Sequence, residues 1–192
     1  MKKILLILVL AAVLGLTAPA VFKNDITKEP LAAPVPTPTE APLDVATSTH
    51  VRSPDGIMTL TIKETKKSDG TTFYSFLVSG EDADNLEIYS KTLTIGKMLL
   101  SLNSWSPDNK YLFITENNGN LDNYLIFKAT GEAFADGTPY IDFGAHYSEK
   151  MTEYTLKDVT GWDGPDLLHV RTSGPAYWFE ISSTAFYRLV QR

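Results

Sequence analysis

The chain has 192 residues and a formal net charge of -6, from 17 basic and 23 acidic side chains. That length is enough for one domain with a sizeable core. An acidic chain without Lys/Arg clusters is a poor partner for a phosphate backbone, which argues against nucleic-acid binding. The chain also contains no cysteine, which excludes a disulfide framework, thiolate catalysis and thiolate metal sites.

Residues 1–22 are typical of an export segment. Lys2 and Lys3 precede an almost uninterrupted apolar run at residues 4–22. Two cations before such a run indicate a cleaved signal peptide or an inside-positive membrane anchor. The 19 residues of the run are nearly enough for a helix to span a bilayer core, which is about 30 Å thick. Both interpretations place the remaining chain outside the cytoplasmic membrane. We expect an uncleaved anchor, with cleavage near Ala18-Pro19-Ala20 and secretion as the alternative.

Residues 23–50 are predicted to form a disordered linker rich in Pro, Thr and Ala. Five of the 11 prolines of the chain fall in this stretch, and no aromatic residue does. Proline removes backbone donors and favours an extended polyproline II conformation, and no apolar period is present to build a core. The linker acts either as a spacer that lifts a domain off a membrane or as a passive tail.

Residues 51–192 are predicted to form an all-β domain. All aromatic residues except Phe22 lie in this range, and the apolar residues come in short alternating runs separated by turn signals. This pattern predicts roughly ten or eleven short strands and no helix. The strand candidates are residues 58–63, 73–78, 86–93, 98–102, 110–115, 124–129, 154–159, 167–172, 177–181 and 185–190.

A turn motif recurs along this domain. Ser106-Pro107-Asp108-Asn109 repeats the earlier Ser53-Pro54-Asp55-Gly56, and Trp162 followed by Gly164-Pro165-Asp166 is a third, degraded copy. Proline presets the backbone of a turn, aspartate bonds nearby amides, and Gly or Asn tolerates positive φ. The spacing of about 53 and 57 residues suits a repeat of one small sheet with its loops.

The stretch from Ser104 to Glu132 resembles the repeat of TolB-type, WD-repeat-like β-propellers. Trp105-Ser106-Pro107-Asp108 enters a strand, and an Asn/Gly-rich hairpin then leads to a second strand and a closing Gly turn. Asn109 replaces the usual glycine, and Arg52 stands where a tryptophan is expected. The resemblance implies four-stranded blades of about 40 to 45 residues, and therefore about three blade-like units.

Known propellers usually have four to eight blades. We therefore expect a partial or small propeller-like array of antiparallel blades, with a compact β-barrel or sandwich as the alternative. We also expect the terminal strand, residues 186–190, to pair with the strand near residues 58–65. That pairing would form within one chain in a compact domain and between chains in an open one.

No catalytic site, metal site or cofactor is predicted. His50, His146 and His169 are isolated in the sequence, and no nucleophile elbow, zinc-binding helix or phosphate-binding glycine loop is present. His169 is interpreted as a packed strand residue. The acidic run at residues 81–85 and the Asn-rich run at residues 117–123 are interpreted as turns in preference to calcium sites.

Aromatic residues supply the candidate binding surface. Trp105 and Trp162 occupy corresponding repeat positions and are interpreted as structural. Tyr177 and Trp178 are neighbours in one strand, so their side chains point to opposite faces and one of them is expected to be exposed. These two residues are the candidate binding residues.

The sequence therefore predicts an exported, non-enzymatic binding module for a protein or glycan partner. One alternative is a structural domain that packs against another copy or an envelope component. A third hypothesis is a hydrolase whose site is assembled from distant residues.

Overall fold

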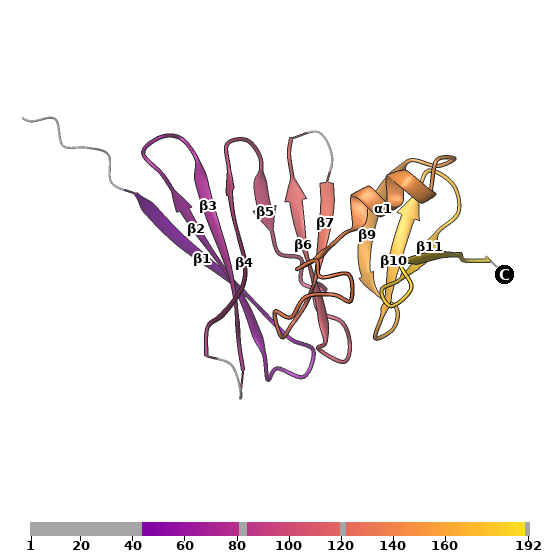
Figure 1. Cartoon of the computed structure of the whole chain (residues 1–192), viewed down its shortest axis with the longest axis horizontal. Helices are drawn as coiled ribbons and strands as arrows, with labels where there is room; N and C mark the ends of the chain where they lie inside the picture. Colours follow the sequence, from indigo (N-terminus) through magenta and orange to yellow (C-terminus); the bar gives the residue numbers. More distant parts are fainter. Residues whose placement is uncertain (1–43, 81–83, 120–121, 191–192) are drawn as a thin grey trace, which may run out of the picture. The chain divides into compact units, whose positions relative to one another are not determined.

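The computed structural model describes residues 44–80, 84–119 and 122–190, which all belong to one compact unit, Glu40–Arg192. These residues form three four-stranded antiparallel sheets and one short helix (Figure 1). The domain is therefore all-β, as the sequence predicts. The predicted export segment and residues 23–43 of the predicted linker lie outside the described residues. In the described part of the chain, no helix is both long enough and apolar enough to cross a membrane.

Within each sheet, the strands neighbour one another in the order of the chain. The first sheet contains β1 (Val45–Arg52), β2 (Thr59–Lys66), β3 (Thr72–Ser79) and β4 (Leu86–Leu93). The second contains β5 (Lys97–Leu99), β6 (Tyr111–Asn117), β7 (Asp122–Lys128) and β8 (Ile141–Asp142). The third contains β9 (Leu156–Trp162), β10 (Leu167–Thr172), β11 (Tyr177–Glu180) and β12 (Ala185–Arg188). Each sheet is thus a meander, so the domain is built from local pairings.

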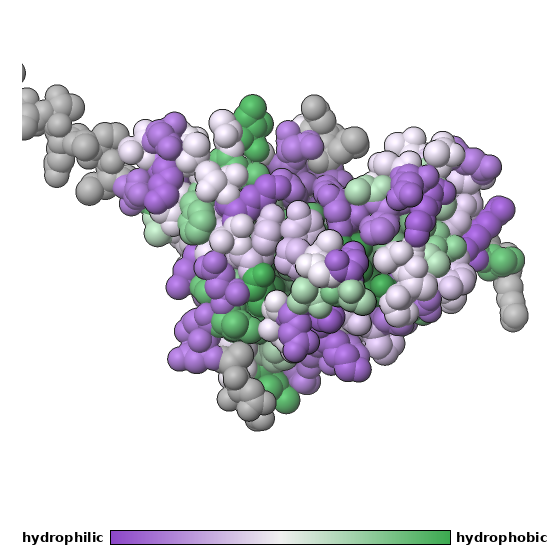
Figure 2. Space-filling model, viewed as in Figure 1, coloured by the Kyte–Doolittle hydropathy of each residue, from purple (hydrophilic) through white to green (hydrophobic). Residues whose placement is uncertain are grey.

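The second sheet lies between the other two. Successive side chains of a strand point to opposite faces, and in β6 this alternation divides the core. Leu112 and Ile114 pack with the first sheet, whereas Phe113 packs with the third. Because both faces of β6 are covered, its apolar run is nearly continuous. The outer surface seen in Figure 2 is mostly hydrophilic, with separate hydrophobic patches, as expected when the large apolar residues lie between sheets.

A short helix, α1 (Phe143–Lys150), follows β8 and corrects the prediction of a domain without helices. Phe143 and Tyr147, four residues apart, are its two buried side chains. Asp142 caps the helix, because its carboxylate accepts a hydrogen bond from the backbone N–H of Ala145 at 3.0 Å. The apolar period of a helix needs more than two turns to appear in a sequence, and α1 has only eight residues.

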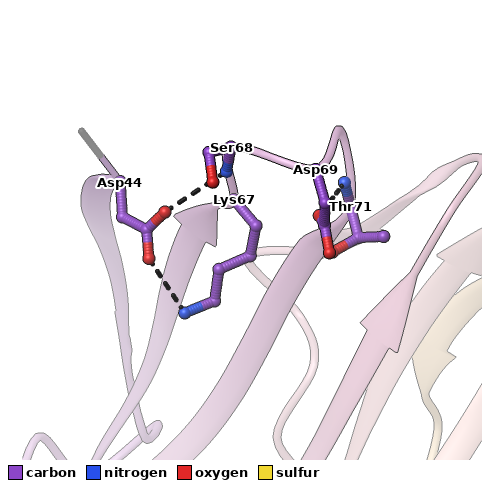
Figure 3. A network of polar contacts seen from close by, with 5 residues as sticks. All are labelled: Asp44, Lys67, Ser68, Asp69 and Thr71. Atoms are coloured by element: carbon purple, nitrogen blue, oxygen red, sulfur yellow. Dashed lines mark hydrogen bonds and ion pairs between the residues drawn. The ribbon is translucent and has the colours of Figure 1, made fainter. Parts of the chain in front are cut away.

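Strand β1 begins at Val45, within the range predicted as linker. All its side chains except Val51 are exposed, so no apolar alternation marks it in the sequence. The strand is held through its backbone ladder with β2. Just before it, Asp44 forms an ion pair with Lys67 at 3.1 Å and accepts a hydrogen bond from the backbone N–H of Ser68 at 3.3 Å (Figure 3). The folded domain therefore begins earlier than the predicted boundary at residue 51.

The predicted partner of the terminal strand is wrong. Strand β12 pairs with β11, which precedes it in the chain. Strand β2 is already paired on one side with β1 and on the other with β3. Because a strand has only two edges, β2 has no edge left for β12, either within the chain or from another copy. The unrecognised β1 occupies the edge that the prediction left vacant.

These contacts predict that β1 is required for full stability. A chain that begins at Val51 should melt at least about 5 °C below the full chain, because it loses Asp44 and uncovers the edge of β2. A chain that begins at Leu43 keeps both and should melt like the full chain. The measurement is thermal unfolding followed by circular dichroism. Equal melting temperatures for the two shortened chains would show that β1 is peripheral.

Candidate functional site

The first two sheets share the turn that joins their first and second strands. In the first sheet, Ser53 Oγ donates to the carboxylate of Asp55 at 2.6 Å. In the second, Ser106 Oγ donates to the carboxylate of Asp108 at 2.8 Å. Each serine backbone N–H also donates to the carbonyl five residues later, at 2.9 Å and 2.8 Å. The two Ser-Pro-Asp motifs therefore form the same turn, which we call the entry turn.

The fourth residue of each entry turn has a positive φ. Gly56 has φ +76° and Asn109 has φ +61°. Asparagine is one of the few residues other than glycine that adopts this conformation readily, so the Asn109 departure from the repeat keeps the turn intact. The Asn109 side-chain amide also donates to the carboxylate of Asp55 in the first entry turn. The two turns are therefore connected directly.

Hydrogen bonds hold the turn carboxylates in their charged form. The pKa of Asp55 is lowered, first by the hydroxyl of Ser53 and then by the backbone N–H of Ile57. For Asp108, burial acts to raise the pKa, but hydrogen bonds from Lys110 and Ser106 outweigh it and the net pKa is lowered. Both carboxylates thus serve the turns themselves, which leaves them poorly suited to proton transfer near neutral pH.

The third sheet has a different turn at the same place. Its residues 163–166 join β9 to β10, and the backbone N–H of Asp163 donates to the carbonyl of Leu167, only four residues later, at 3.0 Å. No serine precedes the proline. The carboxylate of Asp166 accepts instead from the Ser182 hydroxyl at 3.4 Å. The predicted third copy therefore keeps the position of the entry turn without its hydrogen bonds.

Two tryptophans connect neighbouring sheets through equivalent hydrogen bonds. The Trp105 indole N–H donates to the Val51 carbonyl of the first sheet at 3.3 Å. The Trp162 indole N–H donates to the carbonyl of Ser104, just before the second entry turn, at 2.9 Å. Val51 and Ser104 each stand two residues before the serine of an entry turn. Each tryptophan thus binds the same carbonyl position of the preceding repeat.

Arg52 is the first-sheet counterpart of these tryptophans. It lies opposite Thr59, as Trp105 lies opposite Leu112 and Trp162 opposite Leu168. The three corresponding side chains line one cavity of about 290 Å³. Two prolines of the entry turns and Leu102, which is 93 % exposed, complete most of its wall. We call this space the junction cavity, because it lies where the three repeats meet.

The two predicted binding residues are separated by the sheet. Tyr177 is 8 % exposed and packs in the core between the second and third sheets. Trp178 points to the opposite face, where it is partly exposed beside Tyr187, its partner in β12. Tyr187 is 48 % exposed. Tyr187 is not among the residues predicted to bind, although its position next to Phe186 in an alternating run indicates an outward side chain.

The outward face of the third sheet corresponds to buried faces of the other two. We compare one pair of residues in each sheet. The first residue of the pair comes directly after the residue that lies opposite Arg52, Trp105 or Trp162, and the second is its partner in the next strand. They are Leu60 and Val78 in the first sheet, Phe113 and Ile126 in the second, and His169 and Trp178 in the third. The first four are 0 % exposed because another sheet covers them. No described sheet covers the third pair, so we call the surface of His169, Trp178 and Tyr187 the open face.

A larger cleft, of about 680 Å³, lies beside the N-terminus of α1. Asn123 organises its wall: its side-chain oxygen accepts from the backbone N–H groups of Tyr124 and Gly144, and its amide donates to Asp142. A Cβ atom at position 144 would collide with that oxygen, which explains the glycine. Burial raises the pKa of Tyr124 to about 12. A hydrogen bond with the Val159 backbone acts to lower this pKa, and the carboxylate of Asp158 acts to raise it. These groups satisfy one another, so the cleft is best explained as structural.

The three histidines remain apart in the fold. His50 bonds the Thr61 hydroxyl at 2.9 Å, His169 bonds the Thr160 hydroxyl at 2.7 Å, and His146 lies against the ring of Phe179. Among the described residues, no group of three or more His, Asp or Glu side chains is arranged to hold a metal. Residues 81–83 of the predicted acidic turn and 120–121 of the predicted Asn-rich turn lie outside the described residues. The strands flanking the latter do pair as a hairpin.

The tryptophan bonds predict a graded loss of stability. Trp105→Ala should lower the free energy of unfolding by about 3 to 5 kcal/mol, because the ring is buried. Trp105→Phe and Trp162→Phe keep an aromatic ring but remove the N–H donor, so each should cost about 1 kcal/mol. Trp178→Phe, on the open face, should cost less than about 0.5 kcal/mol. The measurement is urea unfolding, and a Trp105→Ala loss no larger than that of Trp178→Phe would contradict the structural role.

Comparison with known proteins gives no relative: no protein-family model, no curated protein and no solved structure matches this chain.

Proposed function

We propose that this chain is an exported, membrane-tethered, non-enzymatic module whose three sheets are propeller-like blades and whose open face binds a protein partner. The observation that supports this most is the partial exposure of His169 and Trp178 at positions where the other two repeats receive a neighbouring sheet, with the exposed Tyr187 beside them. The open face has the position at which each of the other two sheets contacts a neighbouring sheet. It therefore fits a protein partner that offers a flat, partly apolar face, as a sheet does.

The aromatic side chains of the open face are held in place. The Trp178 indole N–H donates to the carboxylate of Asp163 at 2.7 Å, and the Tyr187 hydroxyl donates to that of Glu180 at 3.3 Å. Their polar atoms are therefore already bonded, while their rings stay accessible. Rigid Trp and Tyr rings are frequent energetic centres of protein interfaces. With their polar atoms already bonded, the two rings offer mainly apolar surface, which fits the apolar part of a protein interface.

The opposite end of the array is polar, which argues against head-to-tail packing of a second copy. The second sheet contacts the first through one of its faces, and the third sheet contacts the second through the equivalent face. On the first sheet the equivalent face is the outer one. The paired residues are Leu112 and Phe127 in the second sheet, Leu168 and Phe179 in the third, and Thr59 and Ser79 in the first. Hydroxyl groups thus replace large apolar groups at the first sheet. Repeat arrays end in such polar caps, so the two ends differ in chemistry.

Site-specific photocrosslinking tests the proposal. A photoreactive phenylalanine analogue at position 187 should yield one discrete crosslinked protein in the cells that naturally make the chain. The same analogue at position 63, an exposed site on the first sheet, should yield none. Trp178→Ala should abolish the product from position 187 without changing the melting temperature by more than about 2 °C.

Three results would overturn this assignment. A product that consists of two copies of the chain would support the assembly alternative. Equal products from positions 187 and 63, or no product from either, would show that the open face is ordinary solvent-exposed surface. A product that survives Trp178→Ala would show that the indole is not part of the contact.

A further inference from the structure

The guanidinium of Arg52 is unpaired within the described part of the chain. Across residues 44–80, 84–119 and 122–190, it takes part in no ion pair or side-chain hydrogen bond. The carboxylate of Asp55, three residues away in the sequence, is engaged by the Ser53 hydroxyl, the Ile57 backbone N–H and the Asn109 amide. Arg52 therefore brings a cation with unused donors to the wall of the junction cavity.

The remaining wall of the junction cavity is largely apolar. Trp105 and Trp162 contribute indole rings whose N–H groups are already bonded to backbone carbonyls. Pro54 and Pro107 have no backbone N–H to offer, and the exposed Leu102 adds an aliphatic side chain to the lining. Asn103 also lines the cavity, and its side-chain amide donates to the carbonyl of Thr160. Arg52 is therefore the charged group of this wall. A cavity of about 290 Å³ has room for one amino-acid-sized group.

We propose that the junction cavity binds a carboxylate carried on an apolar body, with Arg52 on the carboxylate and the indole, proline and leucine surfaces on the body. Arginine binds carboxylates through two parallel hydrogen bonds, and aromatic and aliphatic walls favour an apolar group. Two sources supply this chemistry: the C-terminal residue of a hydrophobic peptide and a small aromatic acid. None of the open-face residues lines the cavity, so this site is separate from the proposed protein-binding surface.

An NMR titration of the folded chain tests the site. The probes are N-acetyl-leucyl-phenylalanine with a free carboxylate, the same dipeptide as its C-terminal amide, and phenylacetate. The free dipeptide acid should shift the indole N–H signals of Trp105 and Trp162 and bind about tenfold or more tightly than the amide. Binding of the dipeptide but not of phenylacetate would assign the cavity to peptide C-termini, and comparable binding of both would assign it to apolar acids in general.

Substitutions at the cavity separate the charge from the fold. Arg52→Gln should remove the preference for the acid over the amide, and Arg52→Lys should retain part of it. Arg171→Gln is the matched control, because Arg171 is exposed on the third sheet away from the cavity. Trp178→Ala should leave the titration unchanged even if it abolishes the open-face crosslink. Equal binding of acid and amide, unchanged acid binding by a folded Arg52→Gln chain, or no shift with any probe up to about 10 mM would overturn the proposal.

Discussion

The arrangement of this domain depends on one repeated interaction, a tryptophan indole N–H that binds a backbone carbonyl of the preceding repeat. Trp105 makes this bond to Val51, and Trp162 makes it to Ser104. The ring fills space between two sheets while its single donor fixes their register. A buried carbonyl that lost its donor would destabilise the fold, and a ring removed from the core would leave a cavity. The same contact therefore both holds two sheets together and aligns them. It occurs between the first and second sheets and again between the second and third.

The two ends of the array follow from this interaction. No described sheet precedes the first one. Arg52 stands there at the tryptophan position, and Thr59 and Ser79 stand where the other sheets have apolar pairs. The last repeat keeps a large aromatic side chain, Trp178, on the face that a fourth sheet would cover. The outer face of the first sheet thus carries hydroxyl groups at these positions, whereas that of the third carries a partly exposed indole ring. The junction cavity forms where Arg52, which has no ion-pair partner among the described residues, lies beside the two indole rings that bridge the sheets.

Local chemistry explains which features were predictable from the sequence. The strand candidates at residues 86–93 and 167–172 coincide with β4 and β10. In β10 the buried Leu168 and Val170 alternate with less buried neighbours, which leaves a clear pattern between two turns. The entry turns were recognisable because Ser, Pro, Asp and Gly each have a separate turn role. Strand β1 left no pattern, since its side chains are exposed and its backbone alone carries the pairing. The error about β12 followed directly, because an unseen β1 made β2 an edge strand. The alternation of a strand predicted that Tyr177 and Trp178 point to opposite faces. The position of Tyr187 beside Trp178, and that of Arg52 beside Trp105 and Trp162, could be seen only in the folded structure.

Trp105 and Trp162 are equivalent inter-sheet anchors, and Trp178 is not. Hydrogen exchange of the indole N–H groups, measured by NMR on chain labelled with ¹⁵N-tryptophan, distinguishes the two kinds of residue, because the chain has three tryptophans and so three signals. The indole protons of Trp105 and Trp162 should exchange only through opening of the domain, and at least about tenfold more slowly than that of Trp178. If either anchor proton exchanges as fast as that of Trp178, the corresponding indole does not hold two sheets together.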